Sequence, residues 1–376
     1  MGVNKDNASI ATQSATTRNN HGISLWKIIL PVLIGVGVVA WMFLRDAHNE
    51  DFSSVLASMR FDTRTVLCVI LGFICMFGRD FGLTWRFRAL TDRKLTWPQA
   101  WKVDMLCEFT NCITPSAVGG SSLGMVFLNS QGIEMGRATT LMLTTLFMDE
   151  LFFVVACPFI VLLTSQSEIF ASGGALFSHG LKYTFWVVYA IIAIWTFILF
   201  TGIIWKPEWI KKTLNKISGW KFLKKWSSSI SELGDNMVAT SVELRKKPLG
   251  FWLEVFWGTA LAWTSRYLVV NVLFFGFIPM DDPYQWVIFA RQFVIWVVLM
   301  VSPSPGGAGL SEWLFSEYYG DLVPTAGMAL ILAIFWRVIT YYLYLLIGAV
   351  LVPAWLKKTI EHHQEHRESE KEEKDA

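Results

Sequence analysis

The sequence predicts an all-α integral membrane protein, a polytopic helical bundle with two inverted span-hairpin-span repeats. Three observations support this class. Of the 376 residues, 53% are hydrophobic and only 16% are charged, so a soluble protein of this length would need an unusually large apolar core. Apolar runs of about 20 residues, long enough to cross a bilayer, recur along the chain. Two further apolar segments are broken by proline and glycine.

The chain divides into a leader, a membrane domain and a tail. Residues 1–24 are polar and rich in Asn, Ser and Thr, so we expect a disordered cytoplasmic leader. The membrane domain occupies residues 25–356, and a charged cytoplasmic tail follows over residues 357–376. The apolar run 26–44 lacks a small-residue cleavage pattern, which indicates a retained first span and not a removed signal. Residues 45–64 carry more acid than base and are expected outside.

The first broken segment, residues 101–131, is predicted to be a re-entrant hairpin. Its break contains Thr114, Pro115, Ser116, Gly119 and Gly120. Proline removes a backbone donor and glycine tolerates unusual dihedrals, so a helix cannot continue there. Before the break, the 13 residues from 101 to 113 give only about 20 Å of helix, less than the roughly 30 Å of the hydrocarbon core.

The flanks of this hairpin set its orientation. The span 65–83 precedes it, and the basic residues that follow that span place the hairpin's entry in the cytoplasm; they are Arg86, Arg88, Arg93, Lys94 and Lys102. The span 137–164 follows, and the loop 165–181 has no Lys or Arg, so we expect it outside. Residues 65–164 therefore form the first repeat.

The region between the repeats is predicted to be cytoplasmic. The span 183–205 leads to residues 206–247, which hold ten basic and four acidic residues. Within this region, five apolar residues recur at helical spacing: Leu223, Trp226, Ile230, Leu233 and Met237. They indicate either an amphipathic helix lying on the inner leaflet or a helix that covers the cytoplasmic ends of the spans.

The second broken segment, residues 284–320, follows a span at 249–276. Its break contains Ser302, Pro303, Ser304, Pro305, Gly306, Gly307 and Gly309. Residues 302–324 contain acids but no Lys or Arg, so we expect this hairpin to enter from outside. A final span at 325–352 completes the second repeat, 249–352. Broken helices at matching places in two halves of opposite orientation are typical of transporter binding sites.

Charged side chains deep in the predicted spans mark a candidate site, because burying one there costs on the order of 2.5 to 3.5 kcal/mol on insertion scales. The predicted substrate-binding residues are Arg79, Glu108, Asn111, Thr114, Ser116, Gly119, Gly120, Asp149, Glu150, Arg266, Arg291, Ser304, Gly306, Gly307, Glu312, Arg337 and Tyr341. Guanidinium forks and free backbone amides both recognise phosphate oxygens. The acids suit an amine-bearing headgroup or coupling protons.

Two alternatives apply to these charges. The acids and arginines could serve only to pair with one another and hold the bundle together. Glu312 could cap the helix that begins near Gly309, because acids favour a first helical turn.

The sequence shows no catalytic constellation. The five cysteines lie in or beside apolar segments without a metal-type spacing, so we give them a structural role. The histidines lie outside the expected cavity. We therefore expect no enzyme activity, no metal, no cofactor and no nucleic-acid partner.

Several motifs resemble the flippase-like transmembrane family of lysylphosphatidylglycerol synthases. They are Trp85 with Arg86, residues 111–120, Gly132 with Ile133, Asp149, the run Pro305, Gly306, Gly307, Gly309 and Glu312, and Arg337 with Tyr341 and Gly348. The resemblance covers most of residues 65–352 and implies a lipid-handling protein whose hairpins enclose a headgroup path. Larger relatives add a soluble aminoacyl-transfer domain after this region; these 376 residues stop without one, so lysyl transfer to lipid is not expected.

The leading hypothesis is a flippase or transporter in the bacterial inner membrane, with both termini cytoplasmic. It would carry a phosphate-bearing lipid, either aminoacylated or polyprenyl-linked, by rocking one repeat against the other. Two other classes stay open. One is a membrane enzyme or accessory protein that acts on a lipid-linked substrate. The other is a scaffold for cell-envelope synthesis proteins, with the basic region 206–247 as its docking surface.

Overall fold

The computed structural model describes residues 62–114, 119–170, 175–218, 227–278, 283–300, 302 and 304–356. Every regular element in these ranges is a helix. Several predicted features lie outside the described residues: the leader 1–24, the first span 26–44, the tail 357–376, Pro115, Ser116, Pro303, Leu223 and Trp226.

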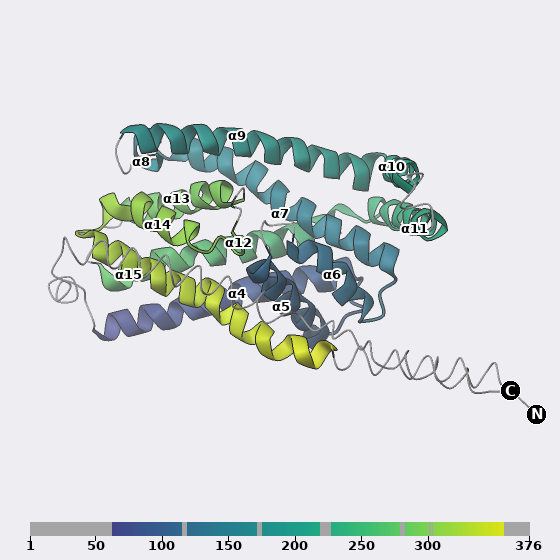
Figure 1. The fold of residues 1–376 in the computed structure, drawn as a ribbon, viewed down its shortest axis with the longest axis horizontal. Coiled ribbons are helices and arrows are strands. Elements are labelled where there is room, and N and C mark those ends of the chain that lie inside the picture. Colours follow the sequence, from purple (N-terminus) through teal and green to yellow (C-terminus); the bar gives the residue numbers. More distant parts are fainter. Residues whose placement is uncertain are drawn as a thin grey trace, which may run out of the picture.

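Figure 1 shows how the helices are arranged. In chain order they are α4 (Thr63–Leu90), α5 (Trp97–Ile113), α6 (Gly119–Asn129), α7 (Met135–Leu163), α8 (Gln166–Ile169), α9 (Ala175–Phe200), the π-helix η1 (Thr201–Trp205), α10 (Glu208–Ser218), α11 (Ser227–Arg245), α12 (Leu249–Phe277), α13 (Pro283–Leu299), α14 (Leu310–Tyr319), the 3-10 helix η3 (Gly320–Leu322), α15 (Ala326–Arg337) and the π-helix η4 (Val338–Tyr342). The helix that begins with α15 continues to Leu356.

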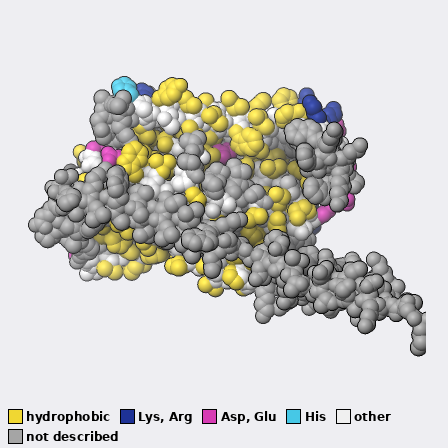
Figure 2. Space-filling view, in the orientation of Figure 1, with side chains coloured by type: hydrophobic (Ala, Val, Ile, Leu, Met, Phe, Trp, Pro, Cys, Tyr) yellow, Lys and Arg dark blue, Asp and Glu magenta, His cyan; other side chains and the backbone are white. Residues whose placement is uncertain are grey.

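Within the described residues, five helices are long and apolar enough to cross a membrane. They are Thr63–Leu90, Met135–Leu163, Ser178–Trp205, Leu249–Phe277 and Ala326–Leu356, each of 28 to 31 residues. Hydrophobic side chains cover much of the described surface along their length, whereas charged side chains gather mainly toward the two ends (Figure 2). The protein is therefore an all-α polytopic membrane protein, which confirms the predicted fold class.

Two pairs of shorter helices, α5 with α6 and α13 with α14, lie in the described part of the chain on either side of the predicted breaks. Helices α5 and α6 have 17 and 11 residues, and α13 and α14 have 17 and 10. In Figure 1, α5 and α6 lie in the half of the molecule toward α10 and α11, while α13 and α14 lie in the opposite half. Re-entrant insertion and the relation by inverted repeats both depend on where the bilayer lies, and they stay predictions.

Helices α4 and α12 pack closely against each other through small residues. A Cβ added at Gly82 would lie 2.6 Å from the carbonyl oxygen of Gly258, and one added at Gly258 would lie 2.9 Å from the carbonyl oxygen of Gly82. Glycine at both positions lets the two backbones approach, as small residues commonly do between membrane helices. This contact fixes the relative position of the two helices that carry Arg79 and Arg266.

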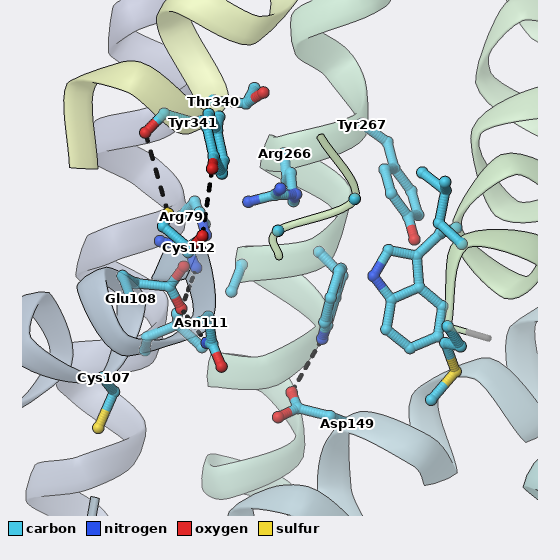
Figure 3. A pocket seen from close by; sticks show the side chains of 18 of the residues that line it. Arg79, Cys107, Glu108, Asn111, Cys112, Asp149, Arg266, Tyr267, Thr340 and Tyr341 are labelled. Atoms are coloured by element: carbon cyan, nitrogen blue, oxygen red, sulfur yellow. Dashed lines mark hydrogen bonds and ion pairs between the residues drawn. The ribbon is translucent and has the colours of Figure 1, made fainter. Parts of the chain in front are cut away.

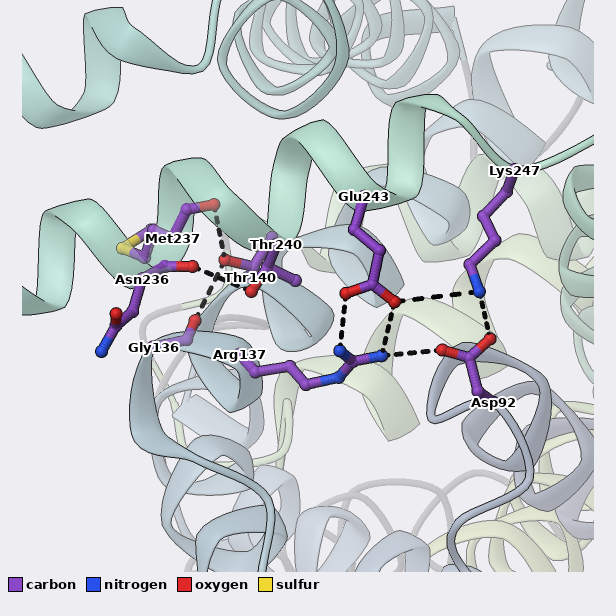
Figure 4. A network of polar contacts seen from close by, with 9 residues as sticks. All are labelled: Asp92, Gly136, Arg137, Thr140, Asn236, Met237, Thr240, Glu243 and Lys247. Carbon is purple, nitrogen blue, oxygen red and sulfur yellow. Dashed lines mark hydrogen bonds and ion pairs between the residues drawn. The ribbon is translucent and has the colours of Figure 1, made fainter.

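Helix α11 covers one end of the spans through a network of polar contacts (Figure 4). Arg137, in the first turn of α7, donates to Glu243 of α11 at 2.7 Å and to Asp92 of the α4–α5 turn at 2.7 Å. Lys247, which follows α11, also pairs with Asp92. Met237 of α11 is buried, and its carbonyl oxygen accepts a hydrogen bond from Thr140 of α7. These contacts favour the interpretation of this segment as a cover for the span ends.

Candidate functional site

A cavity of about 240 Å³, lined by both charged and apolar side chains, lies where the two breaks meet. Helices α4, α5, α7, α12 and α13, the segment before α14, and the junction of α15 with η4 all contribute to its walls. Asp149 and Arg266 lie near the midpoints of their spans. Figure 3 shows the side chains that point into this space. A cavity halfway along apolar helices is the setting in which ionisable side chains are usually functional.

One direct hydrogen bond joins the two breaks at the cavity, and a second ties the end of α5 to η4. The amide of Gly306 donates to the carbonyl of Thr114 at 3.3 Å, and the hydroxyl of Tyr341 donates to the carbonyl of Cys112 at 3.1 Å. Gly306 has a φ of +56°, and a side chain there would collide with the ring of Tyr341. Only glycine accepts both this backbone conformation and this close approach.

Arg337 and Glu312 form a buried ion pair beside this junction. Arg337 Nε donates to Glu312 Oε1 at 2.8 Å, and its Nη2 donates to the carbonyl of Gly306 at 3.2 Å. Glu312 is 0% exposed, and its second oxygen accepts the amide of Gly309 at 2.8 Å at the start of α14. The capping interpretation of Glu312 is thereby confirmed. Arg337 directly precedes the π-helix η4, an irregularity that is frequent at functional sites.

A second ion pair joins α4 to α5. Arg79 pairs with Glu108 of α5 at 2.5 Å and with the adjacent Asp80 at 2.8 Å. Tyr344 donates its hydroxyl to Asp80 at 2.7 Å. The charge of Arg79 is therefore already paired with two carboxylates within the protein.

Arg266 differs from the other cavity arginines because the described residues give its guanidinium no hydrogen bond or ion pair. It lies on α12 and points toward Arg79 and Glu108 (Figure 3). An arginine carries five N–H donors in a fixed fork and is always charged in proteins. Its unused donors face the cavity and are available to an anion.

The α7 side of the cavity holds a third pair. Asp149 accepts from Nη1 of Arg86 at 2.6 Å and from the indole nitrogen of Trp263 at 2.8 Å. The neighbouring Glu150 also lines the cavity but has a buried oxygen without a partner. Asp104 of α5 has one as well.

Most of the predicted substrate-binding residues lie in this one cavity. Those that line it are Arg79, Glu108, Asn111, Asp149, Glu150, Arg266, Ser304, Gly306, Gly307, Arg337 and Tyr341. Glu312 lies behind Arg337, and Thr114 contributes its carbonyl to the junction of the breaks. Gly119 and Gly120 begin α6. Ser116 lies outside the described residues.

Arg291 occupies a different place from the one that the sequence suggests. It is 1% exposed and does not line the cavity. It pairs with Asp321 at 2.5 Å, and Nη1 donates to the carbonyl of Tyr318 at 2.7 Å. Its remaining donors bind the carbonyl of Glu168. These contacts saturate the guanidinium, so Arg291 joins α8, α13 and the end of α14.

Sequence reasoning missed other cavity residues, including Arg86, Trp263 and Trp296. The predicted span ends at residue 83, which places Arg86 in a basic loop, whereas α4 continues to Leu90. Tryptophans at apolar positions carry no signal that separates a cavity wall from a lipid-facing surface.

Among the described residues, no group of three or more His, Cys, Asp or Glu side chains is arranged to hold a metal ion.

The fold and the cavity define a multi-pass helical membrane protein with a charged internal site. The chain belongs to the family described as the lysylphosphatidylglycerol synthase TM region, which matches residues 28–348. It is also similar to a UPF0104 membrane protein of Archaeoglobus fulgidus, with 25% identity over 343 residues that cover 86% of this chain and 95% of the relative. No solved structure was found to match the chain. Family membership supports a protein related to lipid handling.

Proposed function

We propose that the protein is a flippase that moves a phosphate-bearing lipid between the two leaflets of its membrane. The observation that carries this proposal is Arg266, a guanidinium with no partner among the described residues, in a cavity midway along the spans. An unpaired charge at this depth is costly unless water or a ligand solvates it. A phosphate fits because its oxygens accept the paired N–H donors of arginine.

The other groups of the cavity complete the proposed headgroup site. Arg337 and Arg79 add positive charge on two sides, although both are partly neutralised by their carboxylate partners. The glycine-rich break at Gly306 and Gly307 brings main-chain groups to the cavity wall. On the α7 side, Asp149 and the indole of Trp263 would contact the part of the headgroup that lies beyond the phosphate.

The arrangement of the short helices supports alternating access as the transport mechanism. Helices α5–α6 and α13–α14 lie in opposite halves of the molecule (Figure 1), and their breaks meet at the cavity. If each pair is a re-entrant hairpin, rocking one repeat against the other would expose the cavity to one side and then to the other. The aqueous cavity would take the headgroup while the acyl or prenyl chains remain in lipid.

Lipid movement in reconstituted vesicles tests this function. The wild-type chain is expected to move labelled phospholipid, or labelled polyprenyl phosphate, between leaflets. Arg266→Gln is expected to reduce that rate at least tenfold, because loss of a charge-assisted contact worth about 1.5 to 3 kcal/mol changes an equilibrium by tenfold or more. Arg245→Gln is a matched control, because Arg245 is exposed at the end of α11.

The transport rates of Arg266→Gln and the wild-type protein decide whether Arg266 binds the phosphate. Equal rates in Arg266→Gln and wild type would overturn the assignment of the phosphate site. Absence of movement of either lipid by the wild-type protein, with turnover of a lipid-linked substrate instead, would favour a membrane enzyme. Arg266 is a sharper test than Arg337, because removal of Arg337 would leave Glu312 buried without its cation.

A further inference from the structure

Glu150 is a buried acidic residue for which the described part of the chain supplies no hydrogen-bond or ion-pair partner. It lies near the middle of α7, is 2% exposed and lines the cavity. Its Oε2 has no hydrogen-bond partner, and the described residues form no ion pair with it. The adjacent Asp149, by contrast, is paired with Arg86 and Trp263. Two neighbouring acids on one helix therefore have opposite environments.

The elements around Glu150 supply few charges that could compensate it. The other titratable side chains that line the same cavity are Arg79 and Arg86 on α4, Asp104, Cys107, Glu108 and Cys112 on α5, Asp149 on α7, Arg266 and Tyr267 on α12, and Arg337 and Tyr341 near the junction of α15 and η4. Helix α9 also packs against α7, and there Tyr189 donates its hydroxyl to the carbonyl of Val154. Arg79, Arg86 and Arg337 are already engaged by other carboxylates.

An ionised carboxylate in this place would be unfavourable. Burial of a charge without a partner costs far more than burial of the neutral acid, so such a group gives up its charge or acquires a counter-ion. Among the described residues no cluster of ligands could hold a metal ion. Arg266, the cavity arginine without a carboxylate partner in the described part of the chain, points toward Arg79 and Glu108, and no ion pair joins it to Glu150 (Figure 3). A proton is then the ligand that neutralises this carboxyl.

We propose that Glu150 binds and releases a proton during the transport cycle, and that it holds the proton in the conformation described here. This inference deepens the proposed flippase function and, for its coupling step, rests on it. The proton comes from water on the side to which the cavity opens, bonds to one carboxyl oxygen, and leaves as the carboxylate is rehydrated on the other side. No electron transfer or other reactant is involved.

A proton on Glu150 also favours the binding of an anion. It raises the charge of the cavity lining by one unit, so a phosphate at Arg266 is held more strongly by Coulomb attraction. Proton uptake and anion binding are then mutually favourable, as linkage between two sites requires. Proton and lipid are expected to move in the same direction.

Infrared spectroscopy of the purified full-length protein tests the proton site without any transport assay. The wild-type protein at neutral pH is expected to show the carbonyl stretch of a protonated carboxylic acid. Glu150→Gln should lose intensity in this band, whereas Asp149→Asn should keep it, because Asp149 is already ion-paired with Arg86. Coincident spectra of wild type and Glu150→Gln would overturn the proposal. Glutamine resembles the neutral acid, so this variant should also retain the folded state.

Lipid movement under an imposed pH gradient tests the coupling. An inward or outward gradient is expected to change the wild-type rate severalfold, and Glu150→Gln should be insensitive to it. A wild-type rate that is independent of the gradient would exclude coupling through Glu150. If the wild type moves no lipid but the infrared band is present and lost in Glu150→Gln, the flippase proposal fails while the proton site stands.

Discussion

At the scale of single residues, the ion pair of Arg337 with Glu312 does two things at once. It holds the amide of Gly309 and the carbonyl of Gly306 in place, and so it fixes the shape of the second break. Both side chains are almost fully buried. A buried pair need not stabilise a protein relative to apolar residues, but breaking it from one side is costly, because the remaining charge is buried alone.

Arg337→Ala is therefore expected to lower the free energy of unfolding by about 3 to 5 kcal/mol. The double variant Arg337→Met with Glu312→Gln should lose less, because it removes both charges. Thermal unfolding in detergent, followed by fluorescence, measures the difference. A single variant as stable as the wild type would show that Glu312 finds another partner.

At the scale of helices, the close contact of α4 with α12 is the structural basis of the cavity. These two helices carry Arg79, Arg86 and Arg266, and the glycines at their crossing leave no room for side chains. Because the backbones touch, a change at the crossing shifts the arginines relative to one another.

Gly82→Ala is expected to destabilise the protein by about 1 to 3 kcal/mol, the usual cost of overpacking. Gly250→Ala is the matched control, because a Cβ at Gly250 meets nothing within 4 Å. That control should be neutral or stabilising by up to about 1 kcal/mol, since alanine is the better helix former. Thermal unfolding distinguishes the two, and similar changes in both variants would contradict the role given to the crossing.

At the scale of the whole molecule, the network of Arg137, Asp92, Glu243 and Lys247 ties α11 to α7 and to the α4–α5 turn (Figure 4). These side chains are partly exposed, so each pair contributes little to global stability, about 0.2 to 1 kcal/mol. Together they tie α11 to the adjacent ends of α4 and α7.

Arg137→Gln is expected to increase hydrogen exchange in α11 without a large change in unfolding temperature, because the contacts between helices are lost while the core remains. Lys211→Gln offers a comparison, since Lys211 pairs with Asp235 at a more exposed place between α10 and α11. Equal exchange in α11 of both variants would argue against a special role for the Arg137 network. High salt should reproduce part of the effect of Arg137→Gln.

Much of the fold could be predicted from the sequence because a bilayer imposes simple rules. Apolar runs must be helical, and proline with glycine marks where such a run is interrupted. The breaks before Gly119 and Leu310 follow from these rules. The ends of the spans were harder to predict. Helix α4 continues through Arg86, whose guanidinium pairs with Asp149 inside the protein. A hydropathy profile does not indicate this ion pair, which compensates the buried charge.

The sequence predicted most of the charged residues of the candidate site, but it did not predict which acid pairs with which arginine. A charge within an apolar run indicates an interior position, yet α13 is apolar on most sides, so its sequence does not indicate which face meets the cavity. The structure places Gln292 in the cavity and turns its neighbour Arg291 toward Asp321. The partners of Glu312, Asp149 and Glu108 come from distant segments, and only tertiary structure selects them.

The hydrogen bonds that join the two breaks also bear on leakage across the membrane. Gly306 is tied to Thr114, and Tyr341 is tied to Cys112, so neither tip moves away without loss of these bonds. A pore open to both sides of the membrane at once would require both breaks to move apart. Their backbone and hydroxyl groups would then lose these hydrogen bonds. In the proposed transport cycle, this junction would act as a seal that keeps ions from crossing while a bulky headgroup passes.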